Sequence, residues 1–249
     1  MEFAVPKDMP QHTKTTQETL TEGFNRFRDK YYGHGKDLMK KLVAGGANPD
    51  FFIINCIDPR NGADVVFDAP PGQQFLRQQM GAIIPPYDPA TQAELSAALS
   101  YAIDAKKVKH LVIMGHSQCG AVGALVGGTA DPLIDSWVKM AADAKRLAEQ
   151  KVGAGDKEAL LRETERQTVI MSLNNLMEYP MVKKAVAEGR LTVSGWYFDM
   201  AKGALHDYDP KKAAFTQIAP PPAAQKAPAK SARRRPQQKP HWPPHRKAA

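Results

Sequence analysis

The sequence predicts an α/β domain with a central, mostly parallel β-sheet flanked by helices. Three short apolar runs indicate strands: FFIIN at 51–55, HLVIMG at 110–115 and LTVSGWYF at 191–198. The first two lack the alternation of a half-exposed strand, which is typical of strands buried on both faces of a sheet. Segments with helical character separate the runs, and such alternation favours parallel strands.

Helices are expected in four segments: 16–43, 91–105, 118–127 and 132–176. In the first, Leu20, Phe24, Phe27 and Tyr31 form one apolar stripe at helical spacing. The last should form two charged helices, because Gly-Ala-Gly at 153–155 interrupts it. Two further short strands are predicted at 65–67 and 74–76.

The composition divides the chain into a near-neutral body and a basic tail. With 249 residues, 43% of them apolar, the chain can build one domain with a full core. Of its 34 basic residues, ten lie in 211–249, where there is no acidic residue, and the other 24 stand against 26 acidic ones. The tail also holds eight of the 20 prolines. We therefore expect a flexible N-terminus over 1–15, a folded domain over 16–210 and a disordered tail over 211–249.

The environment of the protein can also be predicted. No apolar run approaches the roughly 18 residues that a membrane span needs. The polar N-terminus, broken by prolines, does not resemble a secretory signal, so a cytoplasmic location is expected. The tail either solubilises the protein or attracts an anionic partner weakly.

Both cysteines of the chain follow a predicted buried strand. Cys56 opens the segment CIDPR, and Cys119 lies in HSQCG with His116 three residues before it. The carboxyl ends of parallel strands meet at one edge of a sheet, where α/β proteins build their sites. Two thiolates and an imidazole suit zinc, and three protein ligands with an open fourth position are typical of catalytic zinc. A cysteine after a strand is also commonly a small buried hydrophobic residue. At this point both interpretations remain open.

The motifs CxDxR and HxxCG, about sixty residues apart, resemble those of the β-class carbonic anhydrases, and in particular the plant-type branch. The resemblance extends over roughly residues 18–209. Segments that carry it include Pro71-Gly72, Pro85-Pro86-Tyr87-Asp88, Val108-Lys109-His110 and LMEYPMVKKAVAEGRLTVSGWYFD at 176–199. It implies the reversible hydration of CO2 to bicarbonate and a proton.

The resemblance also implies roles for individual residues. Cys56, His116 and Cys119 would bind Zn2+, with water in the fourth position. Asp58 and Arg60 match the catalytic dyad of the family, in which the carboxylate accepts a hydrogen bond from zinc-bound hydroxide. Arg60 would offer Asp58 a bidentate partner and so keep it off the metal. In a closed state, Asp58 would instead be the fourth zinc ligand. Without a metal site beside them, the two residues would be an ordinary surface ion pair.

The substrate pocket that the family implies is apolar and narrow. Phe75, Met80 and Tyr101 match its lining positions, supplied partly across a dimer interface, so a homodimer or a dimer of dimers is expected. Plain core packing is the alternative explanation for these three side chains. The amide of Gly120, at the start of the helix after Cys119, would face a bound anion.

Three positions depart from the family pattern. Ala47 replaces a substrate-orienting glutamine, and Gln78 and Ala82 replace an arginine and an asparagine. Arg77 is the neighbouring substitute for the lost arginine. Two alternative functions therefore stay open. The same zinc site could hydrolyse carbonyl sulfide or carbon disulfide, or the protein could be a non-catalytic, zinc-stabilised scaffold that recruits partners through its tail.

Overall fold

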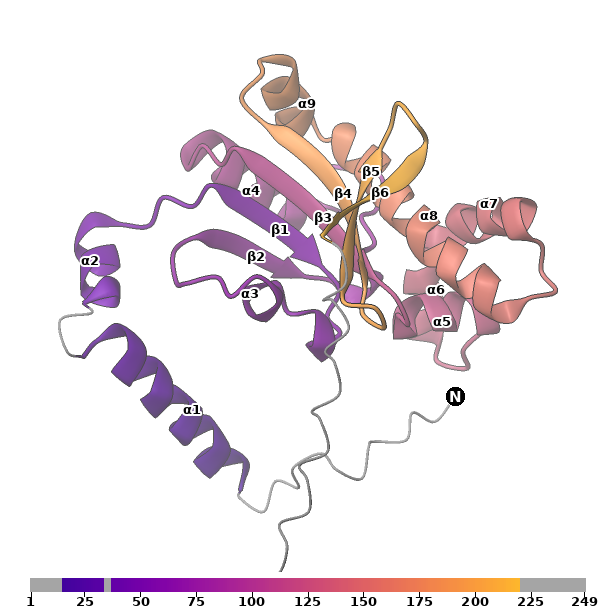
Figure 1. The fold of residues 1–249 in the computed structure, drawn as a ribbon. Coiled ribbons are helices and arrows are strands. Elements are labelled where there is room, and N and C mark those ends of the chain that lie inside the picture. The colour runs from indigo at the N-terminus through magenta and orange to yellow at the C-terminus, as the bar shows by residue number, and fades with distance from the viewer. Residues whose placement is uncertain (1–14, 34–36, 220–249) are drawn as a thin grey trace, which may run out of the picture.

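A six-stranded mixed sheet forms the centre of the computed structural model, which describes residues 15–33 and 37–219 (Figure 1). The strands lie in the order β2-β1-β3-β4-β5-β6. The first four are parallel to one another, and β5 and β6 continue the sheet antiparallel, so the predicted mostly parallel sheet is confirmed. The strands are β1 (Phe51–Asn55), β2 (Gln74–Gln78), β3 (His110–His116), β4 (Thr192–Asp199), β5 (Ala204–Asp209) and β6 (Ala214–Ala219).

Most helices of the described residues lie in the predicted segments, whereas α3 and α9 lie outside them. They are α1 (Thr16–Tyr31), α2 (Leu38–Gly45), α3 (Ala63–Val66), α4 (Ala93–Ser100), α5 (Gly120–Gly127), α6 (Pro132–Val138), α7 (Ala142–Val152), α8 (Lys157–Met177) and α9 (Pro180–Ala187). Short 3-10 turns lie at Pro59–Asn61, Met80–Ala82 and Lys139–Ala141, and a π-helical turn at Tyr101–Ala105 extends α4.

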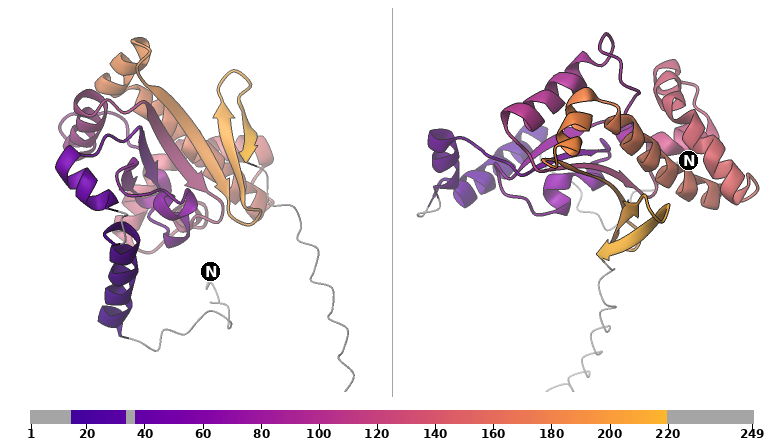
Figure 2. Two further views of the ribbon diagram at one scale, coloured as in Figure 1. Left: turned by 60° about the vertical axis from the view of Figure 1, so that its left-hand side comes forward. Right: turned by 90° about the horizontal axis from the view of Figure 1, so that it is seen from above.

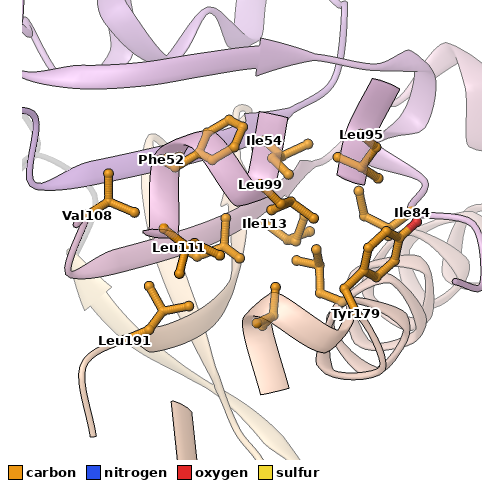
Figure 3. Packing of buried hydrophobic residues seen from close by; sticks show 14 of the residues in the cluster. Phe52, Ile54, Ile84, Leu95, Leu99, Val108, Leu111, Ile113, Tyr179 and Leu191 are labelled. Atoms are coloured by element: carbon orange, nitrogen blue, oxygen red, sulfur yellow. The ribbon is translucent and has the colours of Figure 1, made fainter. Parts of the chain in front are cut away.

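The central strands are buried on both faces, which explains their unbroken apolar runs. On one face, Phe52 and Ile54 of β1 and Ile113 of β3 pack against α4, α8 and α9 (Figure 3). On the other face, Ile53 and Met114 pack in a separate cluster with Ala63 of α3. The two clusters fix the sheet from both sides, and so they fix where β1 and β3 end.

Helix α8 approaches the sheet closely because two strand residues have no side chain. A Cβ atom added at Gly115 of β3 would lie 2.4 Å from Cγ2 of Val169, and one at Gly195 of β4 would lie 3.1 Å from Cγ1 of the same residue. Since no real Cβ atom tolerates the shorter distance, these glycines let α8 lie directly on β3 and β4. This contact holds α8 beside the carboxyl ends of both strands.

The N-terminal helix α1 stands apart from the rest of the described chain (Figures 1 and 2). It begins with a capping box in which the Thr15 hydroxyl accepts from the Glu18 amide and the Glu18 carboxylate accepts from the Thr15 amide. None of its residues is buried, and Leu20 and Phe24 of its apolar stripe are largely exposed. Within the part of the chain described, this stripe therefore lacks a packing partner.

Three sequence-based expectations about elements are wrong. Residues 65–67, predicted as a strand, are the end of α3 and the turn after it, and they do not belong to the described sheet. The segment 132–176 forms three helices, because a 3-10 turn separates α6 from α7 ahead of the predicted glycine break. Helix 118–127 starts two residues later, since Gln118 has a left-handed backbone conformation (φ 58°).

The expected end of the domain near residue 210 is also wrong. Strand β6 continues the sheet to Ala219, and its Phe215 packs its ring against those of Tyr197 (6.0 Å) and Tyr208 (5.3 Å). The expectations for 1–14 and for the tail from 220 onward lie outside the described residues. Among the residues that are described, no helix combines the length and apolar character needed to cross a membrane.

Candidate metal centre

The sheet brings the two cysteine motifs together as its parallel register requires. Asn55, the last residue of β1, pairs with Met114 of β3, so Cys56 and the segment from His116 to Cys119 lie at the same edge. The ligand atoms of Cys56, His116 and Cys119 all lie within 4.8 Å of one another, and all three residues are buried. These three side chains therefore meet at one point, as the sequence predicted.

His116 presents a nitrogen that nothing in the described chain satisfies. Its Nδ1 lies 2.9 Å from the carbonyl oxygen of Ser117, which a protonated Nδ1 donates to. This contact leaves the lone pair on Nε2, which is buried without a hydrogen-bond partner among the described residues. An orphaned imidazole nitrogen of this kind is what a metal ligand requires, because a bound cation satisfies it.

The two sulfur atoms form the rest of the cluster. They lie 3.9 Å apart and are not joined in a disulfide. The backbone N–H of Gly81 donates to the Cys56 sulfur at 3.3 Å, and Gly81 has the left-handed conformation (φ 70°) that the turn needs. The hydrogen bond from Cys119 lowers the pKa of Cys56, and the same contact together with burial raises the pKa of Cys119.

The electrostatics of the cluster favour a cation. Burial disfavours a charged imidazole, but the neighbouring Cys56 sulfur outweighs this effect and raises the pKa of His116. The lowered pKa of Cys56 favours its thiolate, and this buried negative charge attracts a cation to the cluster. Two sulfurs and one imidazole nitrogen in this arrangement fit a metal ion.

Asp58 and Arg60 form a bidentate ion pair beside the cluster. Arg60 Nε lies 2.9 Å from Asp58 Oδ1, and an Nη lies 2.7 Å from Oδ2. The same guanidinium donates to the carbonyl oxygen of Gln118 at 3.2 Å, which ties the turn after β1 to the turn after β3. Asp58 Oδ2 lies 4.0 Å from His116 Nε2. The hydrogen bonds from Arg60 lower the pKa of Asp58 despite partial burial, so Asp58 is an ionised acceptor.

The four predicted pocket residues separate into two groups. Met80 packs against the cluster that contains Cys56 and Cys119, and Gly120 directly follows Cys119 as the first residue of α5. Phe75 and Tyr101 instead contact each other, with ring centroids 5.9 Å apart, and Phe75 also contacts Phe52. Phe52 lies four residues before Cys56, roughly 13 Å away along an extended strand. Within one chain, these two aromatic rings lie away from the metal cluster.

The structure places Gln78, Arg77 and Ala47 in different surroundings. The Gln78 side chain donates to the carbonyl oxygen of Cys56 at 3.3 Å, so it supports the first ligand. Arg77 does not substitute for the missing arginine, because its guanidinium binds Gln79 (3.0 Å) and Glu94. Ala47 is exposed in the segment before β1.

The sequence did not predict the residues that fix the backbone between His116 and Cys119. Ser117 donates its amide to the Phe198 carbonyl (2.9 Å), and its hydroxyl accepts from the Met200 amide (2.8 Å). Glu165 of α8 accepts from the Cys119 amide and from the Tyr197 hydroxyl. The only sequence signal for them is position: Ser117 lies between two ligands, whereas Glu165 is one charge among many in its helix.

Comparison with known proteins identifies the family. A family model described as carbonic anhydrase matches residues 51–205, which contain every candidate site residue named above. Beta carbonic anhydrase 3 of Arabidopsis thaliana is 28% identical over 194 residues, 76% of this chain and 75% of that protein. The chain belongs to the β-carbonic anhydrase family. The enzyme class that the paired motifs predict is therefore confirmed.

Other carbonic anhydrases extend the match. A carbonic anhydrase of Synechococcus elongatus is 30% identical over 190 residues, 75% of this chain and 69% of that protein. Among solved structures, the β-carbonic anhydrase CcaA superposes with a TM-score of 0.74 at 28% identity, covering 81% of this chain and 91% of that one. A tetrameric β-carbonic anhydrase of Sordaria macrospora gives 0.65 at 26% identity, covering 80% and 95%.

Proposed function

We propose that this β-carbonic anhydrase binds one zinc ion through Cys56, His116 and Cys119 and catalyses the reversible hydration of CO2 to bicarbonate and a proton. The observation that carries the proposal is the convergence of three ligand atoms within 4.8 Å, one of them a buried imidazole nitrogen without a partner among the described residues. The reaction, CO2 hydration, is proposed because the chain belongs to the carbonic anhydrase family.

The donor set favours zinc over other abundant cations. Thiolate and imidazole ligands suit zinc, whereas magnesium and calcium prefer oxygen ligands. Three protein ligands leave one position for water. When bound, zinc acts as a Lewis acid that lets water ionise near neutral pH, as is established for carbonic anhydrases.

The role of the protein side chains follows from the ion pair beside the cluster. Asp58 is ionised, so its Oδ2 can accept a hydrogen bond from the attacking oxygen and turn the lone pair of that oxygen toward CO2. Arg60 holds the carboxylate through two contacts and so keeps it available as an acceptor instead of a fourth ligand. Met80 contributes apolar surface beside the ligands, which suits a small apolar substrate.

The rest of the pocket is proposed to come from a second copy of the chain. Phe75 and Tyr101 lie away from the cluster of their own chain, and Tyr101 is 54% exposed. A homodimer, or a dimer of such dimers, would let these rings line the partner's site and would cover exposed apolar surface such as that of Leu76. Light scattering after size exclusion tests this: a monomer at micromolar concentration contradicts it.

Stopped-flow CO2 hydration between about pH 7 and 9, on protein shown to carry one zinc per chain, tests the function. Rapid turnover that Asp58→Ala abolishes is the expected result. Absence of turnover with zinc fully bound contradicts the proposal. Hydrolysis of carbonyl sulfide or carbon disulfide by the same protein would then favour the alternative substrate, which the alanine at position 47 in place of the family's glutamine allows.

The scaffold alternative and the location are tested separately. Truncation after Ala219 keeps β6, the last described strand, and removes most of the basic tail. A carbonic anhydrase keeps its turnover after this truncation, whereas a scaffold without turnover would lose an anionic partner. We propose a cytoplasmic location because the cluster needs both cysteines as thiolates, which a reducing compartment preserves; a secreted, oxidised protein would contradict it.

A further inference from the structure

A buried carboxylate lies directly behind the metal cluster. Glu165 belongs to α8, and its side chain is 1% exposed. Its Oε1 accepts from the backbone N–H of Cys119 at 3.0 Å, and its Oε2 accepts from the hydroxyl of Tyr197 at 2.8 Å. An Nη of Arg162 lies 3.1 Å from Oε1. Each oxygen of the carboxylate therefore has a donor in a low-dielectric environment, where such contacts are strong.

The hydrogen bond from Cys119 to Glu165 lies at the start of α5, where the backbone N–H has no acceptor within the helix. Cys119 is the N-cap of α5, and the residue before it, Gln118, has a left-handed conformation that turns the chain between the two ligands. The amide of a buried N-cap residue has no partner within its own helix. Without Glu165, the Cys119 N–H would lose this acceptor, and the turn that aims the Cys119 sulfur at Cys56 and His116 would be held only at Ser117 and Gln118.

The approach of α8 makes this support rigid. Val169, one helical turn after Glu165, occupies the space above Gly115 and Gly195, so α8 cannot shift toward the sheet. Tyr197 is buried in β4, and the guanidinium carbon of Arg166 lies 5.0 Å from the centre of its ring. Glu165 is thus held by groups of α8 and β4, independently of the metal ligands.

We propose that Glu165 is a positioning residue for the metal centre: its carboxylate fixes the backbone of Cys119, and this slows the release of the bound metal. The inference rests on the proposed zinc site. The proposed function names the residues that bind zinc, whereas this inference concerns how slowly the bound zinc is released.

The experiment compares zinc release from three full-length variants with that from wild type. Zinc is captured by an excess of a chromogenic chelator, and the release rate is measured at neutral pH. Glu165→Ala should release zinc about 10- to 100-fold faster, because removing a group that orients a ligand lowers metal affinity by about that factor. Glu165→Gln keeps Oε1 as an acceptor for the Cys119 amide, so its release rate should stay within about threefold of wild type.

Glu163→Ala is the matched control. Glu163 is a buried carboxylate of the same helix, but its partners are Lys151 and Gln167, each at 2.8 Å, and Arg166. This variant measures the loss of stability from removing a buried carboxylate, and it should retain zinc as wild type does. The absorption spectrum of the cobalt-substituted proteins gives a second readout, because sulfur-to-cobalt bands should change in Glu165→Ala and not in Glu163→Ala.

The outcomes separate this inference from the proposed function. If Glu165→Ala releases zinc no faster than Glu163→Ala, or if Glu165→Gln is as fast as Glu165→Ala, the positioning role is wrong although the zinc site stands. If wild type itself binds no zinc, both proposals fail. Should Glu165→Ala not fold by circular dichroism, Glu165→Asp replaces it, because the shorter side chain withdraws the acceptor and predicts the same faster release.

Discussion

Arg60 contacts both carboxylate oxygens of Asp58, at 2.9 Å through Nε and 2.7 Å through Nη. The two residues are only two positions apart, and the Arg60 amide also donates to Asp58 Oδ1 at 2.9 Å. The planar guanidinium therefore fixes both the position and the rotation of a carboxylate that lies 4.0 Å from the His116 nitrogen. Arg60 therefore controls the orientation of the Asp58 carboxylate and so which donors it can accept from.

Arg60→Lys should lower the rate of CO2 hydration about 10- to 100-fold, because an ammonium makes a single, rotatable contact in place of the fork. The zinc content should not change, since no ligand is altered. Stopped-flow kinetics with parallel zinc analysis checks both statements. Arg190→Lys, at a surface pair with Glu188 (2.6 Å), is the control that should keep full activity. An unchanged rate in Arg60→Lys would show that bidentate contact is dispensable.

Gly115→Ala should destabilise the protein by about 1–3 kcal/mol, because the new Cβ would lie 2.4 Å from Val169 and force α8 away from β3. Urea unfolding measures the loss. Gly123→Ala in α5 is the matched control: a Cβ there meets nothing within 4 Å, so the change should stabilise by about 0.5–1 kcal/mol. Adding Val169→Ala to Gly115→Ala should recover part of the loss, and a purely additive double variant would contradict the steric explanation.

The metal ligands were predictable because each is fixed by a short local pattern. Cys56 and His116 are placed by strands that have to be buried, and parallel pairing brings the ends of such strands together. Glu165 was not predictable in this way. Its helix carries charges around its whole circumference, and nothing in the spacing tells that Glu163 and Glu165 point inward while Glu158 is exposed.

The end of the domain was missed for a different physical reason. The composition after Pro210 is rich in lysine, alanine and proline, which argues for disorder when averaged over the segment. Strand β6 forms there all the same, because the unpaired edge of β5 supplies backbone partners and Phe215 supplies an apolar contact with Tyr208. Pairing of this kind is a tertiary effect that no local pattern contains.

Removal of zinc should lower the thermal midpoint by about 5–10 °C relative to protein held in zinc at a hundredfold excess over its Kd, because zinc binds the folded cluster and stabilises it by mass action. Differential scanning calorimetry with and without chelator measures the difference. Cys56→Ser should lose most of this response. His110→Ala, at the other end of the strand that carries His116, should retain it. A response that is equal in Cys56→Ser and wild type would place the metal elsewhere.

Stability at alkaline pH should depend on Tyr179. Its ring is fully buried, its hydroxyl donates to the Pro85 carbonyl at 3.3 Å, and burial raises the pKa of the phenol to about 12. An unfolded tyrosine ionises near pH 10, so between about pH 10 and 12 the unfolded chain releases this proton first. The stabilisation from the neutral phenol is therefore complete below pH 10 and is lost as the pH rises toward 12.

Tyr179→Phe should be less stable by about 1 kcal/mol at pH 8, from the lost hydrogen bond, yet should lose stability less steeply above pH 10. Urea unfolding of both proteins across this range checks the slope, and parallel curves would show that Tyr179 does not carry the effect.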